Sequence, residues 1–129
     1  MIYIKKFFKT DLGDGKQIAF PKEASNDFFD FNYNSPNHDA DRDITFKFKE
    51  EVITTRIYAN VDTESRIDGP LKKFLIDKLG CIIDDVVIFK KLAEDSYEFE
   101  FVGQGSALYD TCIQILNKNR NKNHAVFID

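Results

Sequence analysis

The densest group of hydrogen-bonding side chains in the sequence lies in YANVDTESRI, at residues 58–67. Amides, carboxylates, hydroxyls and guanidinium groups contact base edges in the major groove of DNA: asparagine pairs with adenine, arginine with guanine, and an acid accepts from cytosine. The residues of these types here are Asn60, Asp62, Thr63, Glu64, Ser65 and Arg66. Polar loops are common, so this group indicates a binding surface only in combination with another one.

A second polar loop lies near the start of the chain, in YIKKFFKTDLGDGKQIAFP at residues 3–21. Residues 2–8 and 16–20 are rich in apolar residues, and we expect them to be paired strands. The loop between them holds two glycines and two aspartates and is longer than a two-residue hairpin turn requires. Its residues alone leave open whether it is a hairpin tip or an arm that contacts a partner.

The residue types needed for catalysis do not come together in a recognisable motif. There is no GxSxG sequence, and GQGSAL at residues 103–108 lacks the third glycine of a dinucleotide-binding loop. Cys81 and Cys112 lack CxxC spacing, and only two histidines are present, so neither a disulfide framework nor a zinc site is indicated. The acids that could in principle form a nuclease-type metal cluster are Asp84, Asp85, Glu98 and Glu100. No lysine follows two residues after either glutamate, so we expect no catalytic residue, no metal and no cofactor.

The elements that position the two loops follow from hydrophobic periodicity. ITFKFKEE places Ile44, Phe46 and Phe48 on one face of a half-buried strand, and β-branched and aromatic residues predict the next strand at 52–61. Two more strands surround the turn AEDS. Helices are expected at 22–31, 69–80 and 106–118. Two strands and a helix, repeated along the chain, favour a mainly β fold: a seven-stranded open β-barrel with two flanking helices plus a C-terminal helix.

The stretch at residues 3–21, with its Tyr-Ile-Lys start and its Gly-Lys-Gln before an apolar run into proline, resembles the opening of the N-terminal effector-binding domain of EcoRII-type restriction endonucleases. That domain is similar to the B-three DNA-binding pseudobarrel of plant transcription factors. TRIYANVDTESRI resembles the family's strand, polar arm and closing strand. PLKKFLIDKLGCIIDDVVIFKKLAEDSYEFEFV resembles its helix, strand and final hairpin, although Asp84 stands where the pattern usually has glycine. The resemblance covers residues 2 to about 116 and rests on the order and spacing of these motifs.

The resemblance implies that two arms at one end of the barrel enter the major groove of double-stranded DNA from either side. The first arm would be residues 10–17 and the second residues 60–66, with Arg66 bonded to a guanine or a phosphate and Lys16 to a phosphate. The implied DNA-binding residues are Lys9, Thr10, Asp11, Gly13, Asp14, Gly15, Lys16, Gln17, Arg56, Asn60, Asp62, Thr63, Glu64, Ser65 and Arg66. Lys5 and Lys22 would be supporting phosphate contacts.

The distribution of charge permits such a partner despite the net charge of −4. Phosphate binding depends on clustered lysine and arginine, and residues 1–22 carry five lysines against two aspartates, whereas residues 23–51 carry eight acids against three bases. A chain with such zones can present one basic face. Both arms are shorter than in the EcoRII type, and the second has lost much of its basic cluster, so we expect weak non-specific binding.

Two functions from different classes remain. The first is a target-recognition domain that binds double-stranded DNA and is not itself an enzyme, attached to the catalytic or motor domain of a larger restriction endonuclease. The alternative is a barrel-like protein-interaction domain without DNA binding, and a small nuclease is a third and weaker reading.

The expected limits of the domain come from composition along the chain. Residues 1–117 should form the pseudobarrel, and residues 118–129 a polar linker and the start of a following segment. No apolar run approaches the roughly 20 residues that cross a bilayer. The start MIYIKKFFK lacks the pattern of a secretory signal peptide. We therefore expect a cytoplasmic protein with no membrane partner.

Overall fold

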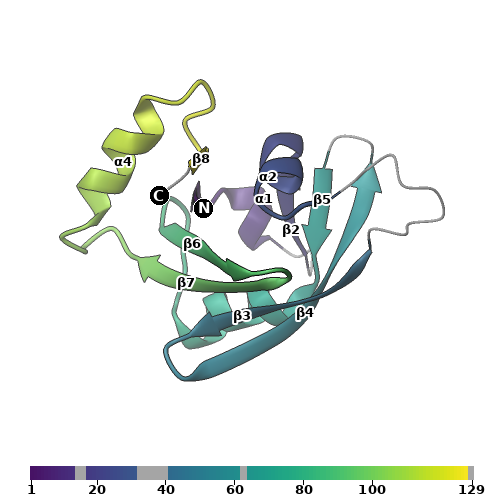
Figure 1. The fold of residues 1–129 in the computed structure, drawn as a ribbon. Helices are drawn as coiled ribbons and strands as arrows, with labels where there is room; N and C mark the ends of the chain where they lie inside the picture. Colours follow the sequence, from purple (N-terminus) through teal and green to yellow (C-terminus); the bar gives the residue numbers. More distant parts are fainter. Residues whose placement is uncertain (14–16, 32–40, 62–63, 128–129) are drawn as a thin grey trace.

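The computed structural model describes residues 1–13, 17–31, 41–61 and 64–127 of the chain. Eight strands and a few short helices follow one another along it (Figure 1). In order, the elements are β1 Ile2–Lys6, α1 Lys9–Leu12, β2 Ile18–Pro21, α2 Lys22–Asp27, β3 Arg42–Phe48, β4 Glu51–Val61, β5 Glu64–Ile67, α3 Gly69–Lys73, the π-helical turn η2 Phe74–Lys78, β6 Val86–Ala93, β7 Ser96–Val102, α4 Tyr109–Asn117 and β8 His124–Phe127.

All eight strands belong to one strongly curled sheet with the order β2-β5-β4-β3-β7-β6-β1-β8. Neighbouring strands are antiparallel except β3 and β7, which are parallel. The sheet stays open between its edge strands β2 and β8, and α2 packs against both of them and against β5 (Figure 1). Pro21 lies in edge strand β2, where its missing N–H breaks no ladder bond on the open side. The predicted mainly β open barrel is confirmed.

Over the described residues the sheet has eight strands rather than the predicted seven. The additional strand is β8, in which Ile4 of β1 pairs with Ala125. It falls within residues 118–129, which the sequence indicated as a linker and the start of a following segment. The apolar residues of HAVF explain the difference, because they pair with β1 as an edge strand of the sheet and do not continue away from the barrel. The domain boundary at residue 117 stays a prediction.

The first two strands do not form the predicted hairpin. β1 pairs with β6 and β8, whereas β2 pairs with β5 at the far edge of the sheet. The chain crosses from one side of the barrel to the other between them, and α1 occupies the start of this crossing. The glycine-containing loop is therefore not a hairpin tip.

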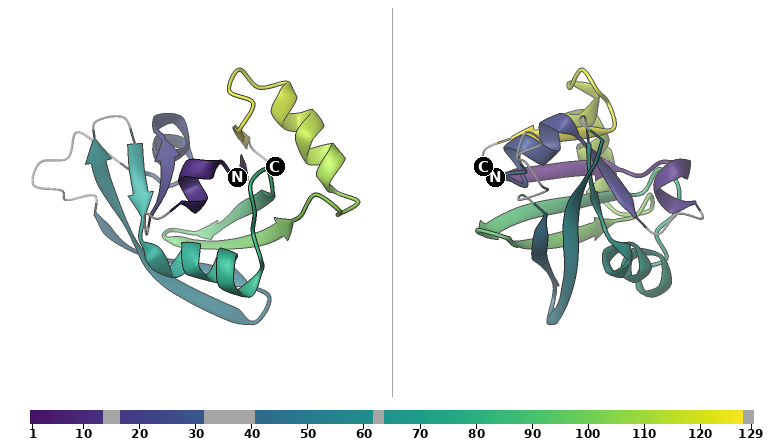
Figure 2. Two further views of the ribbon diagram at one scale, coloured as in Figure 1. Left: turned by 180° about the vertical axis from the view of Figure 1, so that it is seen from behind. Right: turned by 90° about the vertical axis from the view of Figure 1, so that its right-hand side faces the viewer.

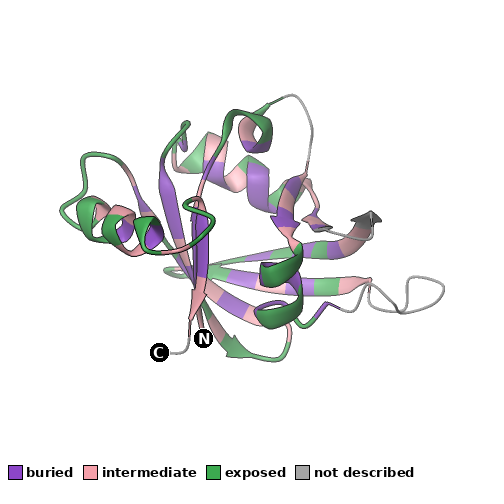
Figure 3. Ribbon diagram, turned by 90° about the horizontal axis from the view of Figure 1, so that it is seen from above, coloured by how far each residue is buried: buried purple, intermediate pink, exposed green. Residues whose placement is uncertain are grey.

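A cluster of aromatic rings fills the barrel. Tyr3, Phe20, Phe29, Phe46 and Phe89 are buried, and neighbouring rings lie with their centroids 4.9–6.4 Å apart, mostly edge to face. This geometry is the one that aromatic quadrupoles favour. Buried and exposed residues alternate along the strands, as the period of two predicts (Figure 3).

The helices flank the barrel at its ends and open side. Seen from behind, α3 and η2 form one helical rod beside β4 (Figure 2), and Gly80, with φ of +67°, follows it in the left-handed region that glycine tolerates. The helix expected at 106–118 begins later, at Tyr109, because Ser106 is held in a turn by its N–H bond to the carbonyl of Gly103. Among the described residues, no helix has the length and apolarity to cross a membrane.

The buried imidazole of His124 predicts an acid-sensitive edge of the sheet. Burial lowers the pKa of His124, nearby Lys5 lowers it further, and Glu23 opposes them. Because the unfolded chain then takes up a proton at a higher pH than the folded one, stability is fully present above about pH 6.5 and falls as the pH drops below it.

Thermal denaturation at pH 7.5 and pH 5.5 checks this prediction. We expect the wild-type chain to lose stability at the lower pH, by at most about 1.4 kcal/mol per pH unit for one proton. His124→Gln should lose clearly less over the same interval. An identical loss in both proteins would contradict the assignment to His124.

Candidate nucleic-acid interface

The first arm begins as a short helix that is anchored by a buried ion pair. Lys9 and Thr10 in α1 are exposed, but Asp11 on the same turn is buried. The Asp11 carboxylate lies 3.3 Å from the ammonium of Lys5 and accepts a hydrogen bond of 2.9 Å from the backbone N–H of Phe8. Asp11 was predicted to contact DNA. The structure instead makes it an internal anchor of the arm.

Lys5 is likewise not placed for the predicted phosphate contact. Its side chain is buried, with the ammonium 5.6 Å from the centroid of the Phe7 ring and 5.8 Å from that of Phe20. Burial lowers the pKa of Lys5, and the charge and hydrogen bond of Asp11 oppose this change. An opposite charge at this distance is what keeps a buried ammonium protonated.

The described ends of the first arm have ordinary backbone geometry. Gly13 has φ of −74°, which any residue adopts, and Gln17 is half-buried beside β2. Asp14, Gly15 and Lys16 lie outside the described residues. Their predicted roles stay predictions.

The second arm is built from the ends of β4 and β5, and the structure describes it in part. Asn60 and Glu64 belong to these strands, but their side chains, like residues 62–63, lie outside the described part. Ser65 is fully buried, and its hydroxyl lies 2.6 Å from that of Ser25 in α2. Ser65 was predicted to contact DNA. Its hydroxyl instead joins β5 to α2.

The two arms leave opposite ends of one short antiparallel ladder. Ile18, which follows the first arm, pairs with Ile67, whereas Pro21 pairs with Glu64 beside the second arm. The resemblance implied that both arms lie at one end of the barrel and that the second spans residues 60–66. Residues 64–66 instead belong to β5, and the four residue pairs of β2 with β5 separate the point where the first arm joins β2 from the point where β5 begins. At about 3.3 Å per residue the two ends of this ladder are about 10 Å apart along the strand.

Between the arms, the outer surface of β2, β5 and β4 carries a row of polar and aromatic side chains. Ala19, Arg66 and Tyr58 are cross-strand neighbours, since Ala19 pairs with Arg66 and Arg66 with Tyr58. Arg56 lies two residues before Tyr58 on the same side of β4, and its guanidinium carbon is 5.3 Å from the centroid of the Tyr58 ring. We call Arg56, Tyr58 and Arg66 the outer triad.

Acidic groups beside the outer triad fix its geometry. One carboxylate oxygen of Asp41 lies 3.1 Å from a guanidinium nitrogen of Arg56, and the other accepts a hydrogen bond of 3.1 Å from the N–H of Ala59. Burial and the charge of Asp68 raise the pKa of Tyr58, while Arg66 opposes the change. A tyrosine phenol is protonated at neutral pH even without this change, so Tyr58 can donate a hydrogen bond.

Tyr58 was not among the residues predicted to contact DNA, although alternation along a strand puts residues 54, 56 and 58 on one face. Of the four acids that could in principle form a metal cluster, Asp85 has a role in the fold. The carboxylate of Asp85 is buried and accepts hydrogen bonds from the backbone N–H groups of Ile82, at 2.8 Å, and Gln104, at 3.2 Å. Over the described part of the chain, no three histidine, cysteine or acidic residues are grouped as a metal site would require.

Comparison with known structures identifies the architecture as an open pseudobarrel of the B-three type. The N-terminal domain of Helicobacter pylori LlaJI.R1 is similar over 99% of this chain and 98% of its own, with a TM-score of 0.68 and 21% identity. A complex of Arabidopsis FUS3 with DNA is similar over 77% of this chain and 93% of its own, with a TM-score of 0.54 and 14% identity.

A third similar structure is a hypothetical protein of Arabidopsis thaliana, with a TM-score of 0.54 and 12% identity over 83% of this chain and 94% of its own. No family model and no curated protein sequence matches the chain. At these identities the likeness establishes the fold alone. It agrees with the fold that the sequence resemblance implied.

Proposed function

We propose that this chain binds double-stranded DNA in a sequence-dependent manner, with the outer triad facing the major groove and one arm on either side. The observation that carries the proposal is the outer triad itself, two arginines and a tyrosine that lie together on the outer face of the neighbouring strands β4 and β5. Arginine recognises guanine through two hydrogen bonds. The major groove is about 12 Å wide, which is close to the roughly 10 Å between the two ends of the ladder of β2 and β5.

The fold supports this proposal in a general way. One similar structure is a complex with DNA, and the sequence resembles the recognition domains of EcoRII-type restriction endonucleases. We therefore propose that the chain supplies target recognition to a larger restriction endonuclease in the cytoplasm, and that an attached domain cleaves or translocates the DNA. In this role the chain itself needs no catalytic residue.

One observation favours the alternative, a protein-interaction domain. Ile82 and Ile83 are 60% and 48% exposed, and Leu108 is 36% exposed. The two segments lie side by side, because the side chain of Gln104 donates to the carbonyl of Ile83 and the hydroxyl of Tyr109 donates to that of Asp84. Exposed apolar side chains of this size can contact a protein.

A salt titration separates the two functions. Each phosphate contact releases a counterion, so log K for DNA falls linearly with log salt at a slope of roughly −0.9 per contact. We expect a duplex selected from a randomised pool to bind with a slope that corresponds to a few contacts, because the arms carry few basic residues. Failure to enrich any duplex, or a slope near zero, would favour the protein-interaction domain.

A further inference from the structure

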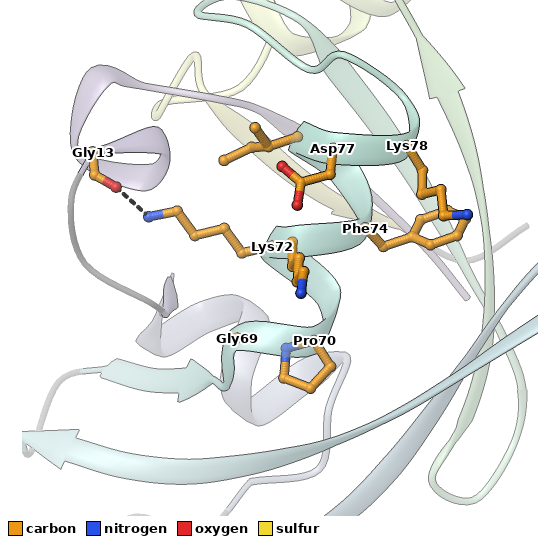
Figure 4. Close-up of a pocket in the computed structure, with 9 residues that line it drawn as sticks. Gly13, Gly69, Pro70, Lys72, Phe74, Asp77 and Lys78 are labelled. Carbon is orange, nitrogen blue, oxygen red and sulfur yellow. Dashed lines mark hydrogen bonds between the residues drawn. The ribbon is translucent and has the colours of Figure 1, made fainter.

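Lys72 connects the start of the first arm to helix α3 across a groove. The groove has a volume of about 810 Å³ and lies between Gly13 and the rod of α3 and η2. The Lys72 side chain is buried along it, and its ammonium donates a hydrogen bond of 2.8 Å to the carbonyl of Gly13 (Figure 4). Gly13 is the last described residue before residues 14–16 of the arm.

The bond between Lys72 and Gly13 stabilises the carbonyl end of helix α1. A helix of four residues is not stable by itself, and the carbonyls at its end lack partners within the helix. The Lys5–Asp11 ion pair holds α1 on the side of the barrel interior. On the side of the groove, the ammonium of Lys72 donates to the carbonyl of Gly13, the residue that follows α1. A cation is favoured at the carbonyl end of a helix.

The neighbouring lysine provides a contrast. Lys73 is exposed on the next position of α3, whereas Lys72 is 5% exposed. A lysine whose ammonium is buried and bonded to a main-chain carbonyl must break that bond before it can contact a phosphate. The exposed side chain of Lys73 needs no such rearrangement. A comparison of variants at the two positions therefore distinguishes the loss of a positioning contact from the loss of a positive charge.

We propose that Lys72 is a positioning residue for DNA recognition: it holds the first arm in the orientation in which the arm contacts bases. This inference rests on the proposed function. It predicts that loss of Lys72 reduces discrimination between DNA sequences, whereas loss of a phosphate-binding lysine weakens all sequences alike and lowers the salt slope by about one contact.

The test compares Lys72→Met with Lys73→Met, two variants that lose the same charge and gain the same side chain. Binding is measured to the selected duplex and to an unrelated duplex at several salt concentrations. We expect Lys72→Met to lower affinity for the selected duplex by about tenfold, a change of about 1.4 kcal/mol. Its affinity for the unrelated duplex and its salt slope should stay unchanged, and Lys72→Arg, which keeps a cationic donor, should restore most of the discrimination.

Hydrogen exchange on the free protein gives a reading that does not depend on DNA. Peptides covering residues 7–20 should exchange faster in Lys72→Met than in the wild type or in Lys73→Met, and Lys72→Gln compared with Lys73→Gln makes the same test if the methionine variant does not fold. Unchanged exchange would overturn the positioning role. Equal weakening of both duplexes with a smaller salt slope would also overturn it, because Lys72 would then be a phosphate ligand. If the wild type binds no duplex, the proposed function fails, and the exchange result alone decides whether Lys72 holds the arm.

Discussion

Replacement of Lys5 by methionine is expected to lower the free energy of unfolding by about 3–5 kcal/mol, because removing one partner leaves the other charge buried and uncompensated. The Lys5 and Asp11 side chains are only 4% and 6% exposed, so water cannot replace the lost ammonium. Urea denaturation of the wild type and the variant measures the change.

Two further variants sharpen this prediction. Lys9→Met removes an exposed lysine of the same arm and should change stability by no more than about 0.5 kcal/mol. The double variant Lys5→Met, Asp11→Leu removes both charges and should be more stable than Lys5→Met alone, although the N–H of Phe8 loses its acceptor. A Lys5→Met protein within 1 kcal/mol of the wild type would show that the pair does not anchor the arm.

Replacement of Arg66 by alanine is expected to weaken binding to the selected duplex by about 10-fold to 100-fold, since a bidentate arginine contact contributes roughly 1–3 kcal/mol of discrimination. Arg66 lies at the centre of the outer surface, paired with Ala19 on one side and Tyr58 on the other. Gel-shift titration of both proteins against the same duplex measures the effect.

The neighbouring residues of the outer triad give the controls for Arg66. Arg56→Ala should weaken binding less, because Asp41 already neutralises part of the Arg56 charge. Ser65→Ala removes a buried hydroxyl and should reduce stability while leaving affinity unchanged in the folded protein. An Arg66→Ala titration that coincides with the wild-type curve would exclude the outer triad as the DNA-contacting surface.

Local patterns in the sequence were sufficient to predict most strands and their inward faces. Ile44 and Phe46 are buried and Lys47 is exposed, as the period of two in β3 requires. The turn AEDS joins β6 and β7 because two strands that are adjacent in sequence pair through a short connection. These features depend only on residues that are close together along the chain, so a short stretch of sequence is enough to predict them.

Features that depend on distant segments could not be predicted. Ile4 pairs with Ile88 and with Ala125, and no local pattern in β1 specifies either partner. The hairpin predicted for the first two strands was wrong for this reason. Asp11 and Ser65 looked like polar loop residues, and only the positions of Lys5 and Ser25 in the folded chain give their side chains buried partners.

The same distant pairing of β1 has a consequence for the kinetics of folding. β1 starts at residue 2, but its two neighbours in the sheet, β6 and β8, start only at residues 86 and 124. Closing such large loops costs chain entropy before any contact compensates for it, so the fold has a high contact order and should form in milliseconds to seconds rather than microseconds. During that interval the unpaired β1 backbone is open to misassociation, and its two lysines reduce that risk by like-charge repulsion between chains.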